Sequence, residues 1–203
     1  KRLKNLELTR KEQRTSGFMH NEMLIRREWT IMEGTRKAAE LALKNAIAFN
    51  IAGGTHHAFS DRGEGFCLLN DHVISANWLL ENKKANKILI VDLDVHQGNG
   101  TAEMCEKTPN IFAFSMHGKN NYPLHKQVSD LDIETEDGIK DQNYLYELEK
   151  SLDHILKSYE PDFIFYQAGV DVLESDKLGR MSLSLAGCKK RDEMVFNYSK
   201  QLE

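Results

Sequence analysis

Apolar residues recur along this chain with two alternating spacings, one typical of helices and one typical of buried strands. Apolar positions three or four residues apart predict helices, over residues 34–46, 69–81, 100–106, 142–159 and 185–201. Short apolar runs without alternation are typical of strands covered on both faces, and they predict strands over 46–52, 87–92, 110–116 and 162–167. Residues 1–30 predict short helices around a loop, and an acidic loop follows the third strand.

Strands that alternate with helices of this length indicate an α/β fold with a mainly parallel sheet. The sequence contains no internal repeat, low-complexity tract or linker rich in proline or glycine, so we expect a single domain over residues 1–203. The chain starts without methionine and ends in Leu-Glu, a pair that expression vectors leave behind. We therefore expect a piece of a longer protein, with a vector-derived end within residues 199–203.

Charge balance and cysteine content narrow the partners and surroundings of the chain. It carries 27 Lys and Arg against 31 Asp and Glu, a formal net charge of −4. Nucleic-acid binders usually have a basic face, and a membrane span needs about 18 consecutive apolar residues, so we expect no direct nucleic-acid binding and no membrane binding. The widely spaced Cys67, Cys105 and Cys188 imply no disulfide framework. We therefore expect buried thiols, a reducing compartment and a cytoplasmic location.

Histidine and aspartate residues follow each of the four predicted strands. In a parallel α/β sheet the working site lies at the carboxyl ends of the strands, so these side chains are expected to gather at one edge. The residues concerned are His56 and His57, then Asp92, Asp94 and His96, then His117, and finally Asp171. This convergence is the main functional signal that the residues give.

Asp94, His96 and Asp171 have the residue types and spacing of a metal site. Asp94 and His96 are two residues apart, so in an extended segment their side chains point the same way. Asp171, at another strand end, adds a third ligand and leaves room for water. Three protein ligands with an open position are typical of a catalytic zinc, although iron or another divalent metal uses the same ligand types. The plainer alternative is that these acidic residues cap helices.

The adjacent residues His56 and His57 suggest acid–base chemistry beside such a metal. Neighbours on an extended segment point to opposite sides, so the pair is not expected to ligate one ion. A carboxylate such as Asp92 and an amide such as Asn99 are able to hold an imidazole in one tautomer. An oriented histidine near a metal-bound water is suited to general base and acid catalysis. Alternatively, one histidine packs in the sheet and the other faces solvent.

Three segments resemble the core motifs of the histone deacetylase superfamily. They read GGTHHAFSDRGEGFCLLND over 53–71, VDLDVHQGNGT over 91–101 and AGVDVL over 168–173. The first segment is most similar to the class IV branch and its bacterial relatives, and the resemblance extends in order over nearly the whole chain. It implies a three-layer arginase/deacetylase-type α/β fold, here lacking N- and C-terminal parts. It also implies zinc-dependent hydrolysis of the amide bond of acylated lysine, with one Zn²⁺ ion.

The resemblance also implies individual roles. It makes His57 the general base and acid and places Asn99 behind it, while Asp92 orients His56. Asp94, His96 and Asp171 become the zinc ligands in this reading.

Further roles concern substrate and a second ion. Gly65 and Phe66 match one wall of an acyl-lysine tunnel, and Tyr122 supplies the opposite wall. A structural K⁺ site, formed partly by backbone oxygens, is implied near Asp92, Asp94, His96, Ser115 and Met116.

The sequence departs from the family pattern at three points. Asn99 stands where many members have aspartate, which softens the electrostatic support for a charged His57, and Gln97 stands where many have a second, non-ligating histidine. The family tyrosine that donates to the oxyanion from a glycine-rich turn has no counterpart, since no GGGY-like segment occurs. Removing one oxyanion donor typically costs about 10²–10³ in rate. We therefore expect an active parent enzyme and an inactive chain of this length.

Two other functions remain open at this stage. An acetylpolyamine or other small acyl-amine amidohydrolase would suit an acidic rim, for which the candidates are Asp130, Asp132, Glu134, Glu136 and Asp137. Such a run is more often a solvated loop. A non-catalytic acyl-lysine binder or scaffold is the third reading, because the missing tyrosine permits it. The expected partner is thus an acylated lysine peptide or a small acylated amine, and the oligomeric state is unknown.

Overall fold

The computed structural model describes residues 1–202, which group into two compact units. The first unit comprises residues 1–84 and 99–104, and the second comprises residues 85–98 and 105 onward. No helix among the described residues is both long and apolar enough to cross a membrane.

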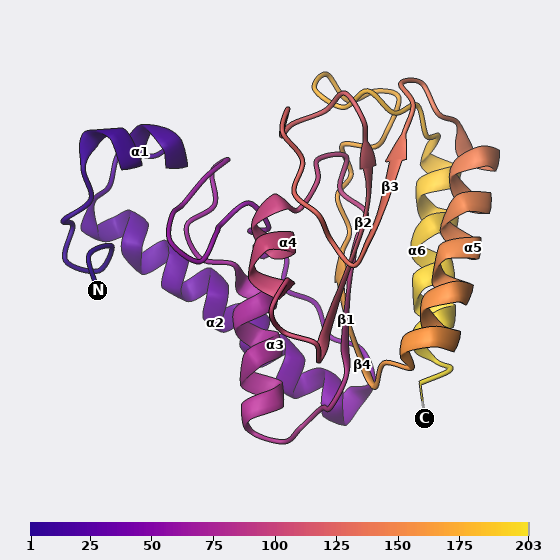
Figure 1. Cartoon of the computed structure of the whole chain (residues 1–203), viewed down its shortest axis with the longest axis horizontal. Helices are drawn as coiled ribbons and strands as arrows, with labels where there is room; N and C mark the ends of the chain where they lie inside the picture. The colour runs from indigo at the N-terminus through magenta and orange to yellow at the C-terminus, as the bar shows by residue number, and fades with distance from the viewer. Residues whose placement is uncertain (203) are drawn as a thin grey trace. The chain divides into compact units, whose positions relative to one another are not determined.

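The first unit is helical and contains α1 (Arg10–Ser16), α2 (Glu22–Asn45), α3 (Asp71–Glu81) and most of α4 (Asn99–Cys105). Side chains cap its helices: Thr9 and Glu12 form a capping box at α1, while Asn21 and Asn70 accept from the first turns of α2 and α3. Asn21 sets the start of α2 a full three turns before the predicted one at residue 34. Helices α2 and α3 pack against each other (Figure 1).

The strand predicted over residues 46–52 is wrong. Residues 47–50 have no regular structure and residues 51–52 form a turn, and the side chains of Phe49 and Ile51 are exposed. Asn50 holds the segment to α2 instead, since its Nδ2 atom donates to the carbonyl of Ile31 at 2.9 Å and to Oγ1 of Thr35 at 2.7 Å. A short apolar run therefore misled the prediction, because nothing in it signals whether a partner strand exists.

The second unit contains a parallel four-stranded sheet in the order β3-β2-β1-β4. Its strands are β1 (Ile88–Asp92), β2 (Ile111–Gly118), β3 (Leu131–Thr135) and β4 (Phe163–Gln167), and its long helices are α5 (Asp141–Tyr159) and α6 (Leu185–Ser199). Figure 1 shows α5 and α6 side by side on one face of the sheet. Strand β1 is buried along its whole length, as its unalternating apolar sequence predicts.

The hydrophobic core of the second unit lies between the sheet and the two helices. Its members include Leu89, Val91, Phe114, Met116, Tyr144, Leu148, Leu152 and Val195. Cys105 and Cys188 are buried in helices as expected, and Cys67 is also buried and in no disulfide. This core fixes the strands whose carboxyl ends carry the candidate site.

Strand β3 forms where the sequence predicts an acidic loop. Acidic side chains alternate with Leu131 and Ile133, which pack against the core of the second unit. Alternation of this kind is typical of an edge strand with one solvated face. The ends of the remaining predicted helices and strands differ by at most two residues from those observed, apart from the longer α2.

Candidate functional site

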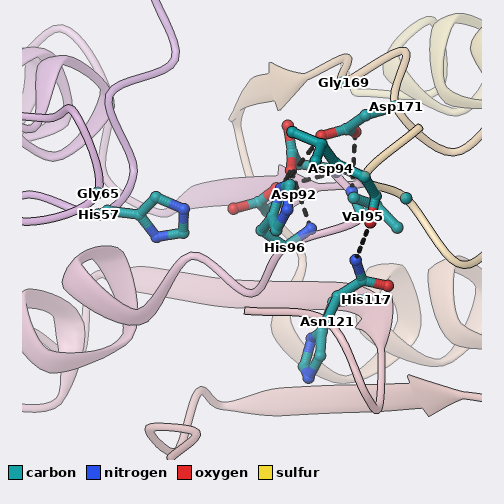
Figure 2. Close-up of polar contacts among 12 residues, drawn as sticks. His57, Gly65, Asp92, Asp94, Val95, His96, His117, Asn121, Gly169 and Asp171 are labelled. Atoms are coloured by element: carbon teal, nitrogen blue, oxygen red, sulfur yellow. Dashed lines mark hydrogen bonds and ion pairs between the residues drawn. The ribbon is translucent and has the colours of Figure 1, made fainter. Parts of the chain in front are cut away.

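Asp94, His96 and Asp171 lie together at the carboxyl ends of two neighbouring strands (Figure 2). Asp94 and His96 follow β1, and Asp171 follows β4, which pairs with β1 up to Asp92 opposite Gln167. Each residue offers one ligand atom, and these atoms lie within 4.8 Å of one another. Their side chains are 13%, 21% and 24% exposed, respectively, so a ligand can reach them.

The two carboxylates converge on one imidazole nitrogen. Nδ1 of His96 lies 3.0 Å from Oδ1 of Asp94 and 3.1 Å from Oδ2 of Asp171. Burial disfavours the imidazolium, but hydrogen bonds and charge from Asp171 and Asp94 outweigh it and raise the pKa of His96 to about 9. Positive charge is therefore favoured between these two carboxylates.

Backbone N–H groups fix the two carboxylates. The amide of His96 donates to Oδ1 of Asp94 at 2.9 Å, and the amide of Val95 donates to Oδ1 of Asp171 at 3.1 Å. Gly169 packs so closely that a Cβ atom there would collide with Asp94. Two aspartate oxygens and one histidine nitrogen, held in this way with an open side, fit a catalytic zinc ion, and other divalent metals accept the same donors.

His56 and His57 belong to the first unit, in the loop between α2 and α3. Both are buried, and their ring centroids lie 4.1 Å apart. Nδ1 of His57 lies 2.7 Å from Oδ1 of Asn99 at the start of α4. The structure thus brings Asn99 to the position expected for it, although its catalytic role stays a prediction.

The Asn99 side chain also fixes the tautomer of His57. Its Oδ1 atom accepts from the amide of Gly100 at 3.1 Å, and its Nδ2 atom donates to Oε1 of Glu64 at 3.0 Å. These partners determine which end of the amide faces His57, so Nδ1 of His57 must carry the proton. The other ring nitrogen, Nε2, is then the basic one in the neutral imidazole.

Asp71 anchors the loop that carries the two histidines. Its buried carboxylate accepts from the amides of Gly54 at 3.0 Å and Thr55 at 2.8 Å, and from the hydroxyls of Thr55 and Thr35. Burial favours the neutral acid, but the charge of His72 and these hydrogen bonds outweigh it and lower the pKa of Asp71. The loop is therefore held by one ionised side chain rather than by strand pairing.

Gly65 and Phe66 form the tip of a tight turn. The amides and carbonyls of Glu64 and Cys67 bond to each other across it, at 3.0 and 2.9 Å. Both tip residues have positive φ, 54° for Gly65 and 62° for Phe66; such turns favour glycine. A Cβ atom on Gly65 would lie 2.7 Å from the His57 ring. Phe66 is exposed, and its ring lies edge-on to that of Phe18, with centroids 5.6 Å apart; its contact with a substrate stays a prediction.

Tyr122 and the residues of the implied potassium site belong to the second unit. The Tyr122 ring lies edge-on to the His96 ring, with centroids 6.5 Å apart. Asp92 pairs in register with Ser115, and the Asp92 carboxylate accepts from the amide of Asp94 at 3.1 Å. Met116 follows Ser115 in β2. Potassium binding by this group stays a prediction.

The residues of the acidic run mostly serve contacts within the second unit. Asp130 and Asp132 accept hydrogen bonds from protein N–H groups, while Glu136 and Asp137 form ion pairs with surface cations. Because these four carboxylates already have partners within the unit, the acidic run gives no support to a polycationic substrate.

The sequence does not indicate the contacts of Glu64, Asp71 or Arg191. Glu64 and Asp71 lie inside the 53–71 motif, but no spacing rule indicates what each contacts. Arg191 carried no signal at all, because a charged residue in an amphipathic helix is normally expected on the solvated face. The metal triad and the histidine pair lie in different units, so their joint action, including the orientation of His56 by Asp92, stays a prediction.

Comparisons with known proteins place this geometry in context. A family model described as histone deacetylase domain matches residues 2–203. An uncharacterized protein of Picosynechococcus sp. (strain ATCC 27264 / PCC 7002 / PR-6) is 43% identical over 190 residues, which cover 94% of this chain and 63% of that protein. Histone deacetylase 2 of Arabidopsis thaliana is 32% identical over 171 residues, covering 83% of this chain and 44% of that protein.

Among solved structures, an HDAC homolog from Aquifex aeolicus matches with a TM-score of 0.76 and 30% identity, over 83% of this chain and 49% of that one. The chain thus spans less than two thirds of the length of these relatives. The parallel sheet with its helices and this likeness confirm the predicted deacetylase-type fold. Since the family model covers almost every residue, the chain belongs to the histone deacetylase domain family.

Proposed function

We propose that this chain is part of a zinc-dependent hydrolase that cleaves the amide bond of acylated lysine. The observation that carries the proposal is the convergence of Asp94, His96 and Asp171, with ligand atoms within 4.8 Å of one another. Membership of the histone deacetylase domain family supports the reaction class. An HDAC homolog of the same fold has been solved in complex with SAHA, and we infer an acylated substrate for this chain as well.

Asp94, His96 and Asp171 would hold the metal, which when bound polarises the amide carbonyl and lowers the pKa of its water. His57 is suited to accept the water proton at Nε2, because Asn99 keeps the proton of the neutral ring on Nδ1. The same nitrogen then returns the proton to the leaving amine. Asn99 is neutral, so it orients His57 without adding a full negative charge behind the imidazolium.

Phe66 and Tyr122 would bind the substrate. Phe66 stands at the tip of its turn and is exposed, with its ring edge-on to that of Phe18 at 5.6 Å between centroids. Tyr122 presents its ring edge-on to His96. Aromatic rings of this kind suit the methylene chain of a lysine, since they offer apolar contact without hydrogen bonds.

Zinc stoichiometry tests the proposal on the chain itself. The wild-type chain and Asp171→Ala are loaded with zinc, dialysed and measured for retained metal, with circular dichroism to check folding. We expect one retained zinc ion in the wild type and none in Asp171→Ala. A folded wild-type chain that retains no zinc would contradict the metal site. Hydrolysis of acyl-lysine peptides by the full-length protein then tests the substrate.

A further inference from the structure

Arg191 is a fully buried charge in the middle of α6, with 0% of its surface exposed. Charged side chains are almost never buried completely unless they are paired and hydrogen-bonded. Lys189 and Lys190, the residues before it, are exposed as expected for an amphipathic helix. A buried arginine among exposed lysines calls for a specific set of partners.

The guanidinium of Arg191 joins two backbone carbonyls from different strand ends. Its Nη1 atom donates to the carbonyl of Gly169 at 2.6 Å and to that of Leu93 at 3.2 Å. Leu93 immediately precedes the ligand Asp94, and Gly169 lies two residues before the ligand Asp171. One side chain therefore contacts both segments that carry the metal triad.

The two contacts of Arg191 lie just beyond the last hydrogen bonds between β1 and β4. The ladder between β1 and β4 ends with Asp92 opposite Gln167, and one further bond runs from the amide of Leu93 to the carbonyl of Gln167 at 3.1 Å. Both segments then leave the sheet to deliver their ligands. Arg191 ties them together across this gap, at the level of Leu93 and Gly169.

The guanidinium is itself held from behind by Asp192. Nε of Arg191 donates to Oδ1 of Asp192 at 2.9 Å, and Nη2 lies 2.8 Å from the same oxygen. Tyr166 in β4 donates its hydroxyl to that oxygen at 2.5 Å. The Tyr166 ring centroid also lies 5.8 Å from the centre of the guanidinium. Asp192 and Tyr166 thus fix the orientation in which Arg191 donates to the two carbonyls.

We propose that Arg191 is a positioning residue that sets the separation of Asp94 and Asp171, and through it the affinity and geometry of the metal site. The inference rests on the proposed function, since it assumes that the triad binds a metal. Lysine cannot replace it, because an ammonium is a compact point charge whereas the planar guanidinium offers several donors in fixed directions. Partners of metal ligands typically change metal affinity by about 10–100-fold when they are removed.

Cobalt titration of this chain tests the inference, with Co²⁺ as a coloured substitute for zinc. We compare the wild type, Arg191→Lys and Asp192→Ala, with Lys190→Gln as the control on the same helix. The readouts are the Co²⁺ dissociation constant, the visible absorption spectrum of the bound ion, and the thermal midpoint of the metal-free chain. Asp192→Ala is included because it removes the ion pair that orients Arg191 and leaves the two backbone carbonyls that Arg191 contacts in place.

We expect Arg191→Lys to bind Co²⁺ about 10-fold or more weakly and to show a changed spectrum. Asp192→Ala should shift both in the same direction by less, and Lys190→Gln should match the wild type. If Arg191→Lys does not fold, Asp192→Ala decides the question. Wild-type affinity and spectrum in the folded variants would overturn the positioning role and leave the proposed function intact. A wild-type chain that binds no Co²⁺ would overturn both.

Discussion

The histidine loop of the first unit and the aspartate–histidine triad of the second are fixed by different means. The triad stands at the ends of paired strands, and backbone amides of Val95 and His96 orient its carboxylates. The histidine loop has no strand beneath it, and the side chains of Asp71 and Asn99 hold it. In a sheet, many backbone hydrogen bonds together position a residue. A loop of this kind depends instead on a few side chains. The loop is therefore the more fragile of the two to single substitutions.

Loss of Asp71 should have the largest effect on stability. Asp71→Ala leaves the amides of Gly54 and Thr55 and the Thr35 hydroxyl without their buried acceptor, and unsatisfied buried donors cost about 1–3 kcal/mol each. We expect the free energy of unfolding in urea to fall by about 3 kcal/mol or more. Asp71→Asn, which keeps one acceptor oxygen, should lose less. A loss below about 1 kcal/mol in Asp71→Ala would show that the loop does not depend on this anchor.

Zinc binding to the triad should stabilise the chain, and this is the second largest effect that we expect. Ligand at 100 times its dissociation constant adds about 2.7 kcal/mol to the stability of the state that binds it. We expect the thermal midpoint of the wild type to rise with zinc and to return after chelation, whereas Asp171→Ala should not respond. Glu174→Gln, an exposed carboxylate three residues away, is the matched control. An equal zinc response in Asp171→Ala would remove Asp171 from the site.

The turn at Gly65 allows a smaller, cleaner test of the histidine loop. Gly65→Ala introduces a positive-φ alanine, worth about 1–2 kcal/mol, and a Cβ atom 2.7 Å from the His57 ring. Gly138→Ala is the control, because Gly138 has φ +76° and open space around its Cβ position. Both variants should lose stability, but only Gly65→Ala should shift the NMR signals of His57. Unshifted signals would mean that the turn does not constrain this ring.

Replacing Glu28 should have the smallest effect, and it should raise stability rather than lower it. Burial, aided by the charge of Asp71 and opposed by Arg27, raises the pKa of the Glu28 carboxyl. Its contribution to folding is therefore present below the ordinary glutamate pKa and is lost as pH rises through the raised one. We expect Glu28→Gln to have a higher thermal midpoint than the wild type near neutral pH, with the difference shrinking toward acid pH. A difference that does not change with pH would exclude Glu28 as its source.

The sequence predicted the triad more readily than its surroundings, and the reason is physical. Asp94 and His96 share one side of an extended segment because side chains alternate along it, and Asp171 follows a recognisable strand. No comparable rule leads to Glu64, whose partner Asn99 is 35 residues away. Strand β3 was hidden because its acidic residues suit both a loop and an edge strand. Over residues 46–52 the error is the opposite one: a strand is predicted and none forms. An apolar run does not reveal whether a partner strand exists.

The contact between Asn99 and Glu64 has a consequence for how such sites can evolve. Nδ2 of Asn99 donates to Oε1 of Glu64, whose other oxygen accepts from Nε of Arg62 at 3.2 Å. An aspartate at position 99 would have no N–H to donate, and its charge would face the Glu64 carboxylate directly. Positions 64 and 99 should therefore covary among relatives: a carboxylate is expected behind the histidine at position 57 only where position 64 in the neighbouring turn carries none.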